Sequence, residues 1–225
     1  DLKNKLKLKS ISINTIHNWI NFSNNIKYNN KKTDLNVFKF LWVGRIIPWK
    51  GIDVLINLSI ILRQKDFTNF KFHVFGDFDN EIYKREIFNI IQSNNLKSFF
   101  VFHGYKSHDA IFDNFYDLFI HTSKMPEPFG RTIIENMYQG NPVFATEMGG
   151  VIDIVKSNFN GFTYDVNDLD KLSNIILELI YNNDLKQKII SNGELTVKKY
   201  FSGNLQIDQI NSSYEKLWKK LIFCL

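Results

Sequence analysis

Glu127 and Glu135 occupy a segment whose residue types suit the binding of a long polar ligand. Pro128 prevents a helix from extending back through Glu127, and Gly130 allows a ligand to approach the backbone closely. We expect a helix to begin near Phe129 or Gly130, with free N–H groups available to an anion. Glu135 would lie about one and a half turns inside it. Each carboxylate can accept charge-assisted hydrogen bonds worth roughly 1.5–3 kcal/mol, including from both hydroxyls of a ribose.

A purely structural interpretation of the same two acids is also open. Glu127 would then be a partner of the helix dipole, and Glu135 a solvated or lysine-paired residue on the helix surface. The neighbours of Glu135 are Ile133, Ile134 and Met137, so its surroundings are expected to be apolar. An acid in such surroundings favours a functional role.

Two cations, Arg45 and Lys50, stand in the loop Gly44–Gly51, between a predicted strand and a predicted helix. Gly44 permits a sharp exit from the strand. The helix start and the two cations together could neutralise a diphosphate without a metal. The alternative is a surface loop with two solvated charges.

A second loop contains Asp77 and Asp79, a spacing that could hold a divalent cation bridging two phosphates. Aspartate is also an ordinary loop and helix-capping residue. A third loop carries Gly149 and Gly150 before another predicted helix. Either a close approach of the backbone to a ligand or a tight turn explains this glycine pair.

No other catalytic motif is found. The sequence lacks a Gly-x-Ser-x-Gly elbow, a Walker A loop and a Gly-x-Gly-x-x-Gly fingerprint, which argues against a hydrolase, an NTPase and a dinucleotide enzyme. The histidines show no metal-ligand spacing, and most are expected to be core or surface residues: His17, His73, His103, His108 and His121.

The elements that must position these loops alternate regularly between apolar strands and amphipathic helices. The predicted strands are Phe38–Val43, Phe70–Phe75, Phe99–His103, Leu118–His121, Pro142–Ala145 and Phe162–Tyr164. The predicted helices are Gly51–Gln64, Asn80–Asn94, His108–Asn114, Gly130–Gln139, Val151–Lys156, Asp168–Asn182, Asp184–Tyr200 and Leu205–Leu221. This alternation predicts an α/β fold with a doubly wound, mostly parallel Rossmann-like sheet and helices on both faces. Ligands of such sheets bind at the carboxyl ends of the strands, where these loops lie.

A separate element is expected to precede this domain. Residues Lys5 to Ile13 alternate strictly between polar and apolar, which predicts a half-exposed strand. Asn21 to Asp34 are rich in Asn, Lys and Ser, which is typical of a linker.

Composition limits the setting and the partners. The 225 residues carry a net charge of +5, spread along the chain, so we expect no nucleic-acid partner. Cys224 is the one cysteine, which favours a reducing, cytoplasmic location. No apolar stretch is long enough to span a bilayer, although peripheral contact with the inner membrane surface is compatible with the charge.

In order and spacing, these motifs resemble the C-terminal donor-binding domain of the retaining glycosyltransferases of family 4, which have the GT-B fold. The resemblance covers about residues 38 to 200. The residues that carry it are Val43-Gly44-Arg45 with Lys50-Gly51, the Glu127-x7-Glu135 pair, Gly140-Asn141-Pro142-Val143, Gly149-Gly150 and Asn160-Gly161-Phe162.

The resemblance implies a role for each candidate residue. Arg45 and Lys50 would bind the donor diphosphate, Glu135 the ribose, and Glu127 the transferred sugar. The remaining donor-binding residues would be Gly44, Tyr105, Lys106, Phe129, Gly130, Arg131, Gly149 and Gly150, with the nucleobase near Tyr105 and Lys106. Sugar would be transferred from a UDP- or GDP-linked donor to a sugar, glycan or lipid-linked acceptor, with retention and without metal or cofactor.

Two departures from the family pattern are present. Asp153 stands where Glu is usual, and the N-terminal half that carries the acceptor site is missing. Residues 1–35 would be a remnant strand and linker of that lobe, with Trp19 in place of a usual Gly, and residues 36–225 the donor-binding domain. The chain would therefore need a separate N-terminal lobe. A non-catalytic nucleotide-sugar-binding subunit and a metal-dependent transferase using Asp77 and Asp79 are the alternatives.

Overall fold

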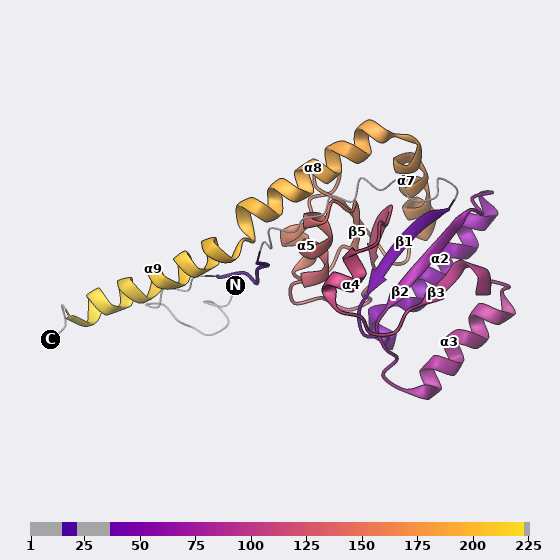
Figure 1. Ribbon diagram of the computed structural model, residues 1–225, viewed down its shortest axis with the longest axis horizontal. Helices are drawn as coiled ribbons and strands as arrows, with labels where there is room; N and C mark the ends of the chain where they lie inside the picture. The colour runs from indigo at the N-terminus through magenta and orange to yellow at the C-terminus, as the bar shows by residue number, and fades with distance from the viewer. Residues whose placement is uncertain (1–14, 22–36, 223–225) are drawn as a thin grey trace.

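The computed structural model describes residues 15–21 and 37–222. Its core is a six-stranded sheet in the order β3-β2-β1-β4-β5-β6 (Figure 1). The pairs between neighbouring strands are parallel. The strands are β1 (Phe38–Val43), β2 (Phe70–Phe75), β3 (Phe100–Phe102), β4 (Leu118–His121), β5 (Val143–Thr146) and β6 (Phe162–Tyr164). The predicted α/β class and parallel sheet are therefore confirmed.

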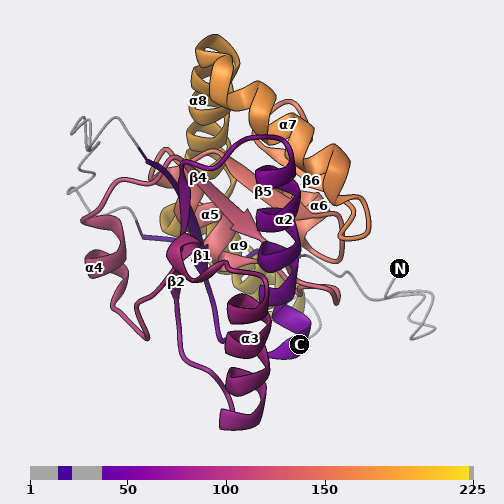
Figure 2. The same ribbon diagram turned by 90° about the vertical axis from the view of Figure 1, so that its right-hand side faces the viewer.

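Helices cover both faces of the sheet, because successive strand residues point to opposite sides. Phe40 and Trp42 pack with α2 (Ile52–Gln64), α3 (Glu81–Ser93) and α7 (Leu169–Tyr181). Leu41 belongs to the opposite core, with α4 (His108–Phe112), α5 (Arg131–Tyr138) and α6 (Val151–Ile154). Figure 2 shows α2 and α4 on opposite sides of β1 and β2. Helix α8 (Asn183–Tyr200) contributes a side chain to each core.

The C-terminal helix α9 (Gly203–Ile222) extends away from the sheet (Figure 1). Where α9 begins, the segment 15–21 joins the fold: Ile20 N donates to Phe201 O at 3.1 Å, and Gly203 N donates to Ile20 O at 3.2 Å. The predicted strand Lys5–Ile13 and all but the first residue of the predicted linker lie outside the described residues. None of the helices in the described part is long and apolar enough to cross a membrane.

Most predicted boundaries agree with the structure to within two residues. Two short 3₁₀ helices were not predicted, η1 (Pro48–Lys50) and η2 (Lys97–Phe99). Helix α5 begins at Arg131, slightly later than expected, because Gly130 has a φ of 95° and cannot belong to a right-handed helix. The prediction that residues 1–35 and 36–225 are separate units stays a prediction.

The strand order reverses between β1 and β4, since the chain runs outward from β1 to β3 and then returns to β4. Such a reversal leaves a crevice at the carboxyl ends of the two strands, where doubly wound proteins bind ligands. The loops that leave β1 and β4 are those that carry Arg45, Lys50 and Glu127. The topology thus brings the predicted site residues of both loops to one place.

Candidate functional site

The two loops at the strand reversal are held together by a buried threonine. Thr122 Oγ1 accepts from Trp42 Nε1 at 2.8 Å and donates to Lys50 O at 2.6 Å. Gly51 packs against the same threonine: its φ is 74°, and a Cβ there would lie 2.1 Å from Thr122 O. This close fit requires glycine and fixes where Lys50 stands relative to β4.

The helices that start at this crevice lack side-chain caps. Helices α2 and α5 have Gly51 and Gly130 at the N-cap, and neither makes a side-chain capping bond. Four other helices do have a side-chain cap, and their capping residues are Asn80, Ser107, Asp168 and Asn182. Uncapped N-termini leave N–H groups available to an anionic ligand.

Lys50 and Glu127 form an ion pair between Nζ and Oε2 across the crevice. Both side chains are largely buried, with exposed fractions of 20% and 16%. His121 Nε2, at the end of β4, lies 3.6 Å from the same carboxylate oxygen. Ser123 Oγ is 3.0 Å from His121 Nε2 and 3.4 Å from Glu127 Oε2. The Glu127 carboxylate therefore faces one cation, Lys50, and two other polar groups, His121 and Ser123.

These contacts determine the charge state of the cluster. Polar contact with His121 lowers the pKa of Glu127 to about 2, and Lys50 adds to this effect, against the opposing effect of burial. Burial lowers the pKa of His121. Near neutral pH, Glu127 is thus ionised and His121 uncharged.

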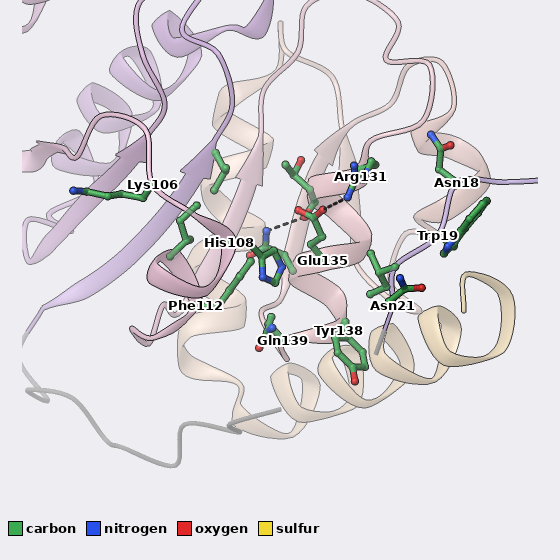
Figure 3. A pocket seen from close by; sticks show the side chains of 15 residues that line it. Asn18, Trp19, Asn21, Lys106, His108, Phe112, Arg131, Glu135, Tyr138 and Gln139 are labelled. Carbon is green, nitrogen blue, oxygen red and sulfur yellow. Dashed lines mark hydrogen bonds and ion pairs between the residues drawn. The ribbon is translucent and has the colours of Figure 1, made fainter. Parts of the chain in front are cut away.

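A cavity of about 690 Å³ adjoins α5 and contains Glu135 (Figure 3). Arg131 Nη2 lies 3.3 Å from Glu135 Oε1, one helical turn away. Glu135 is only 16% exposed and Arg131 is 66% exposed. Asn18, Trp19 and Asn21 lie on one side of this pair, and Lys106, His108 and Phe112 on the other (Figure 3). The cavity is large enough for a nucleoside, since ligand pockets of about 300–1,000 Å³ are usual.

A second cavity of about 390 Å³ lies at the ends of β1, β2 and β3, and Lys106 lines both cavities. Of the predicted site residues, Gly44, Arg45 and Tyr105 also line it. Within the described part of the chain, the Arg45 side chain has no hydrogen bond or ion pair. It is exposed and therefore free to meet a ligand.

Asp77, on the rim of this second cavity, has a structural role. Its Oδ1 accepts a hydrogen bond from Tyr105 N at 3.1 Å, which fixes the loop that follows β3. Among residues 15–21 and 37–222, no group of three or more His, Cys, Asp and Glu side chains is placed to hold a metal.

The glycine pair packs against the loop that carries Glu127. A Cβ on Gly149 would lie 2.4 Å from Glu127 O, and one on Gly150 would lie 2.3 Å from Pro128 O. Gly150 N donates to Glu127 O at 2.7 Å. The close backbone approach at Gly149 and Gly150 is therefore between two protein segments. The ring of Phe129 packs on that of Phe201, with centroids 5.6 Å apart, while the donor contact predicted for this residue stays a prediction.

Several residues that shape the site were not predicted from the sequence. His121 and Ser123 surround Glu127, and Asn18, Trp19 and Asn21 form one wall of the larger cavity. The sequence offered one signal for His121 and Ser123: His121 ends a predicted strand, and Ser123 follows it closely. Nothing in the local sequence indicated that residues 18–21 lie beside α5.

The fold and the site define a doubly wound α/β protein with a polar, cationic crevice at its strand reversal. Comparison with known families identifies it further: residues 23–196 match the model of the glycosyl transferases group 1 family. The chain belongs to this family, and its fold is that of one lobe of a GT-B enzyme.

Known relatives are consistent with this assignment. The uncharacterized glycosyltransferase MJ1178 of Methanocaldococcus jannaschii is 33% identical over 96% of this chain and 57% of its own length. The poly(ribitol-phosphate) alpha-N-acetylglucosaminyltransferase of Staphylococcus aureus is 27% identical over 82% of this chain and 37% of its own length. The chain thus spans about half the length of such relatives or less.

A solved structure shows the same fold. Anabaena Alr3699/HepE, in complex with UDP-glucose, superposes with a TM-score of 0.73 and 29% sequence identity. The matched region covers 80% of this chain and 49% of that protein.

Proposed function

We propose that this chain binds the donor of a glycosyltransferase, a nucleotide-linked sugar, at the crevice between β1 and β4. The arrangement of Lys50 and Glu127 supports this proposal most strongly: an ion pair across the strand reversal, beside a cavity that contains Glu135. In a nucleotide-linked sugar, a diphosphate joins two parts that are rich in hydroxyl groups. A cation and an uncapped helix start suit the diphosphate, and an acid suits the hydroxyl groups.

Each part of the donor has a matching group. Lys50 and Arg45 bind the diphosphate and stabilise the charge that develops on it when the sugar leaves. Glu127 accepts from hydroxyls of the transferred sugar. Glu135 is the acceptor for the ribose hydroxyls, because it is buried at the wall of a nucleoside-sized cavity. The base lies near Lys106, which lines both cavities.

The chemistry follows from what these residues provide. The acceptor hydroxyl attacks the anomeric carbon from the face that the diphosphate leaves and gives its proton to the departing phosphate oxygen, so the sugar configuration is retained without a protein nucleophile. The two cations offset the phosphate charge, so we propose that no metal is needed. We place the acceptor site in an N-terminal lobe outside these 225 residues, in line with relatives that are about twice as long.

UDP and GDP are the first ligands to test, and HepE, which was solved with UDP-glucose, favours UDP. Calorimetric titration of the chain with each nucleotide in the presence of EDTA should show binding, unchanged when magnesium replaces EDTA. Absence of binding at millimolar nucleotide would refute the proposal. Binding that EDTA abolishes would favour the metal-dependent alternative through Asp77 and Asp79.

Glu135 provides the sharper form of the same experiment. Glu135→Gln should weaken UDP binding about 10- to 100-fold, which is the loss expected for a charge-assisted hydrogen bond. Glu178→Gln, on the exposed side of α7, is the matched control and should bind like the unaltered chain. Equal affinity of both variants would remove Glu135 from the site.

A further inference from the structure

His121 is a buried polar side chain beside Glu127, and its two ring nitrogens face different partners. The residue is 6% exposed. Nδ1 lies 3.3 Å from Thr146 Oγ1 on β5, and Nε2 faces Ser123 Oγ and the carboxylate of Glu127. Tyr164 OH donates to His121 O at 2.9 Å and anchors the backbone. The ring is therefore fixed by groups from β5, β6 and the loop after β4.

The partners of this ring select one tautomer. A neutral imidazole carries one N–H. A lone pair on Nε2 would point toward the carboxylate oxygen 3.6 Å away, which is repulsive, whereas an Nε2–H is attracted to it. The Nε2–H form also lets Nδ1 accept from the hydroxyl of Thr146. The proton thus belongs on Nε2, with Ser123 accepting from it and donating to Glu127.

Glu127 consequently has two sets of partners. One is the Lys50 ammonium, and the other is the neutral pair formed by Ser123 and His121. A diphosphate in the crevice attracts Lys50 and competes with Glu127 for it. An ionised, largely buried carboxylate left without any partner would be costly, so the neutral pair makes the exchange of Lys50 favourable.

We propose that His121, acting with Ser123, is a positioning residue that holds the Glu127 carboxylate when the donor diphosphate takes Lys50. The inference deepens the proposed function and rests on it. Without the neutral pair, Glu127 retains Lys50 more strongly, and the diphosphate binds less well. The carboxylate also loses the orientation it needs to meet a sugar hydroxyl.

Two disruptive variants and one conservative substitution test this role. His121→Asn removes the group at Nε2, and Ser123→Ala removes the hydroxyl that joins it to Glu127. Each should weaken binding of UDP-glucose and of inorganic pyrophosphate about tenfold, the loss of one hydrogen bond to a charged group. His121→Gln restores an N–H near the position of Nε2 and should recover most of the affinity. His73→Asn, a histidine of β2 away from the crevice, is the control and should leave binding unchanged.

Nuclear magnetic resonance of the ligand-free chain tests the proposal separately from the proposed function. The imidazole nitrogens of His121 should report the Nε2–H tautomer, and His121→Asn should raise the pKa of Glu127 from about 2 toward its ordinary value. If the unaltered chain binds no nucleotide, the proposed function fails. The tautomer measured for His121 still shows whether its Nε2 carries the proton that faces Glu127. An Nδ1–H tautomer, or unchanged UDP-glucose affinity in His121→Asn, would overturn the proposal.

Discussion

Lys50 and Glu127 are 77 residues apart in the chain and form an ion pair across the site. Each is needed by a different part of the proposed ligand, so the pair keeps both charges compensated in the empty site. The Lys50–Glu127 arrangement differs from a catalytic acid and base pair, in which two carboxylates flank the bond that is broken. Glu135 stands apart on α5 and pairs with Arg131 instead.

The charge state of Glu127 predicts how stability depends on pH. Its pKa is about 2 in the folded chain and near 4.5 when unfolded, so the unfolded state takes up the proton first as the pH falls. The stabilisation is complete above about pH 4.5 and is lost as the pH falls toward 2. Its size is of the order of 1–3 kcal/mol.

Urea unfolding at a series of pH values measures this effect. The difference in unfolding free energy between the unaltered chain and Glu127→Gln should shrink as the pH falls from 5 to about 2. A difference that stays constant over this range would show that Glu127 is not held in its ionised form by Lys50 and His121.

The candidate residues were predictable only in part. Arg45, Lys50 and Glu127 could be found because they stand in loops directly after apolar strands. The link between His121, Ser123 and Glu127 could not, because a histidine at a strand end has the same local sequence whether it packs in a core or faces a carboxylate. The surroundings of His121 depend on the register of β4 with β5, which brings Thr146 close to the imidazole ring.

At the scale of elements, the positions of loops depend on glycines that allow two backbones to meet. Gly149 has a φ of 63°, and a side chain there would collide with Glu127 O. Gly44 is a useful contrast: its backbone is outside the left-handed region, and a Cβ would lie 3.4 Å from the nearest atom of the Trp42 ring.

Alanine at these two glycines should destabilise the chain to different extents. Gly149→Ala should destabilise the chain by at least about 1–3 kcal/mol, since it adds strain and forces the Glu127 loop away. Gly44→Ala should cost less than about 1 kcal/mol. Chemical denaturation of both variants measures the difference. Equal stability would mean that the turn at Gly149 can relax without moving the loop.

Most elements could be predicted from the sequence because buried parallel strands are short apolar runs. Phe38–Val43 and Phe70–Phe75 begin and end where predicted. The start of α5 was less certain, since the local pattern does not reveal the left-handed conformation of Gly130. Pro48–Lys50 was read as loop, because three residues are too few to show helical periodicity.

At the scale of the whole molecule, the strand order turns separate loops into one site. Residues from β1, β4 and α5 converge at the reversal, and the segment 15–21 adds a further wall to the cavity beside α5. Sequence patterns predicted the parallel class, but no local pattern gives the strand order.

Ligand binding at this junction should stabilise the entire fold. UDP at about 100 times its dissociation constant should add about 2.7 kcal/mol, which corresponds to a rise of roughly 5–10 °C in the melting temperature. Uridine, which lacks the diphosphate, should give a much smaller rise at the same concentration. Equal effects of the two compounds in a thermal scan would show that Lys50 and Arg45 do not bind phosphate.

A crystal structure of the chain with UDP would show directly whether the donor binds at this crevice. The diphosphate should lie between β1 and β4, with Lys50 turned from Glu127 to a phosphate oxygen and Glu135 accepting from the ribose hydroxyls. Glu127 should then be held by Ser123 and His121. UDP bound away from this crevice, or bound there with the Lys50–Glu127 pair intact, would show that these residues do not bind the donor as proposed.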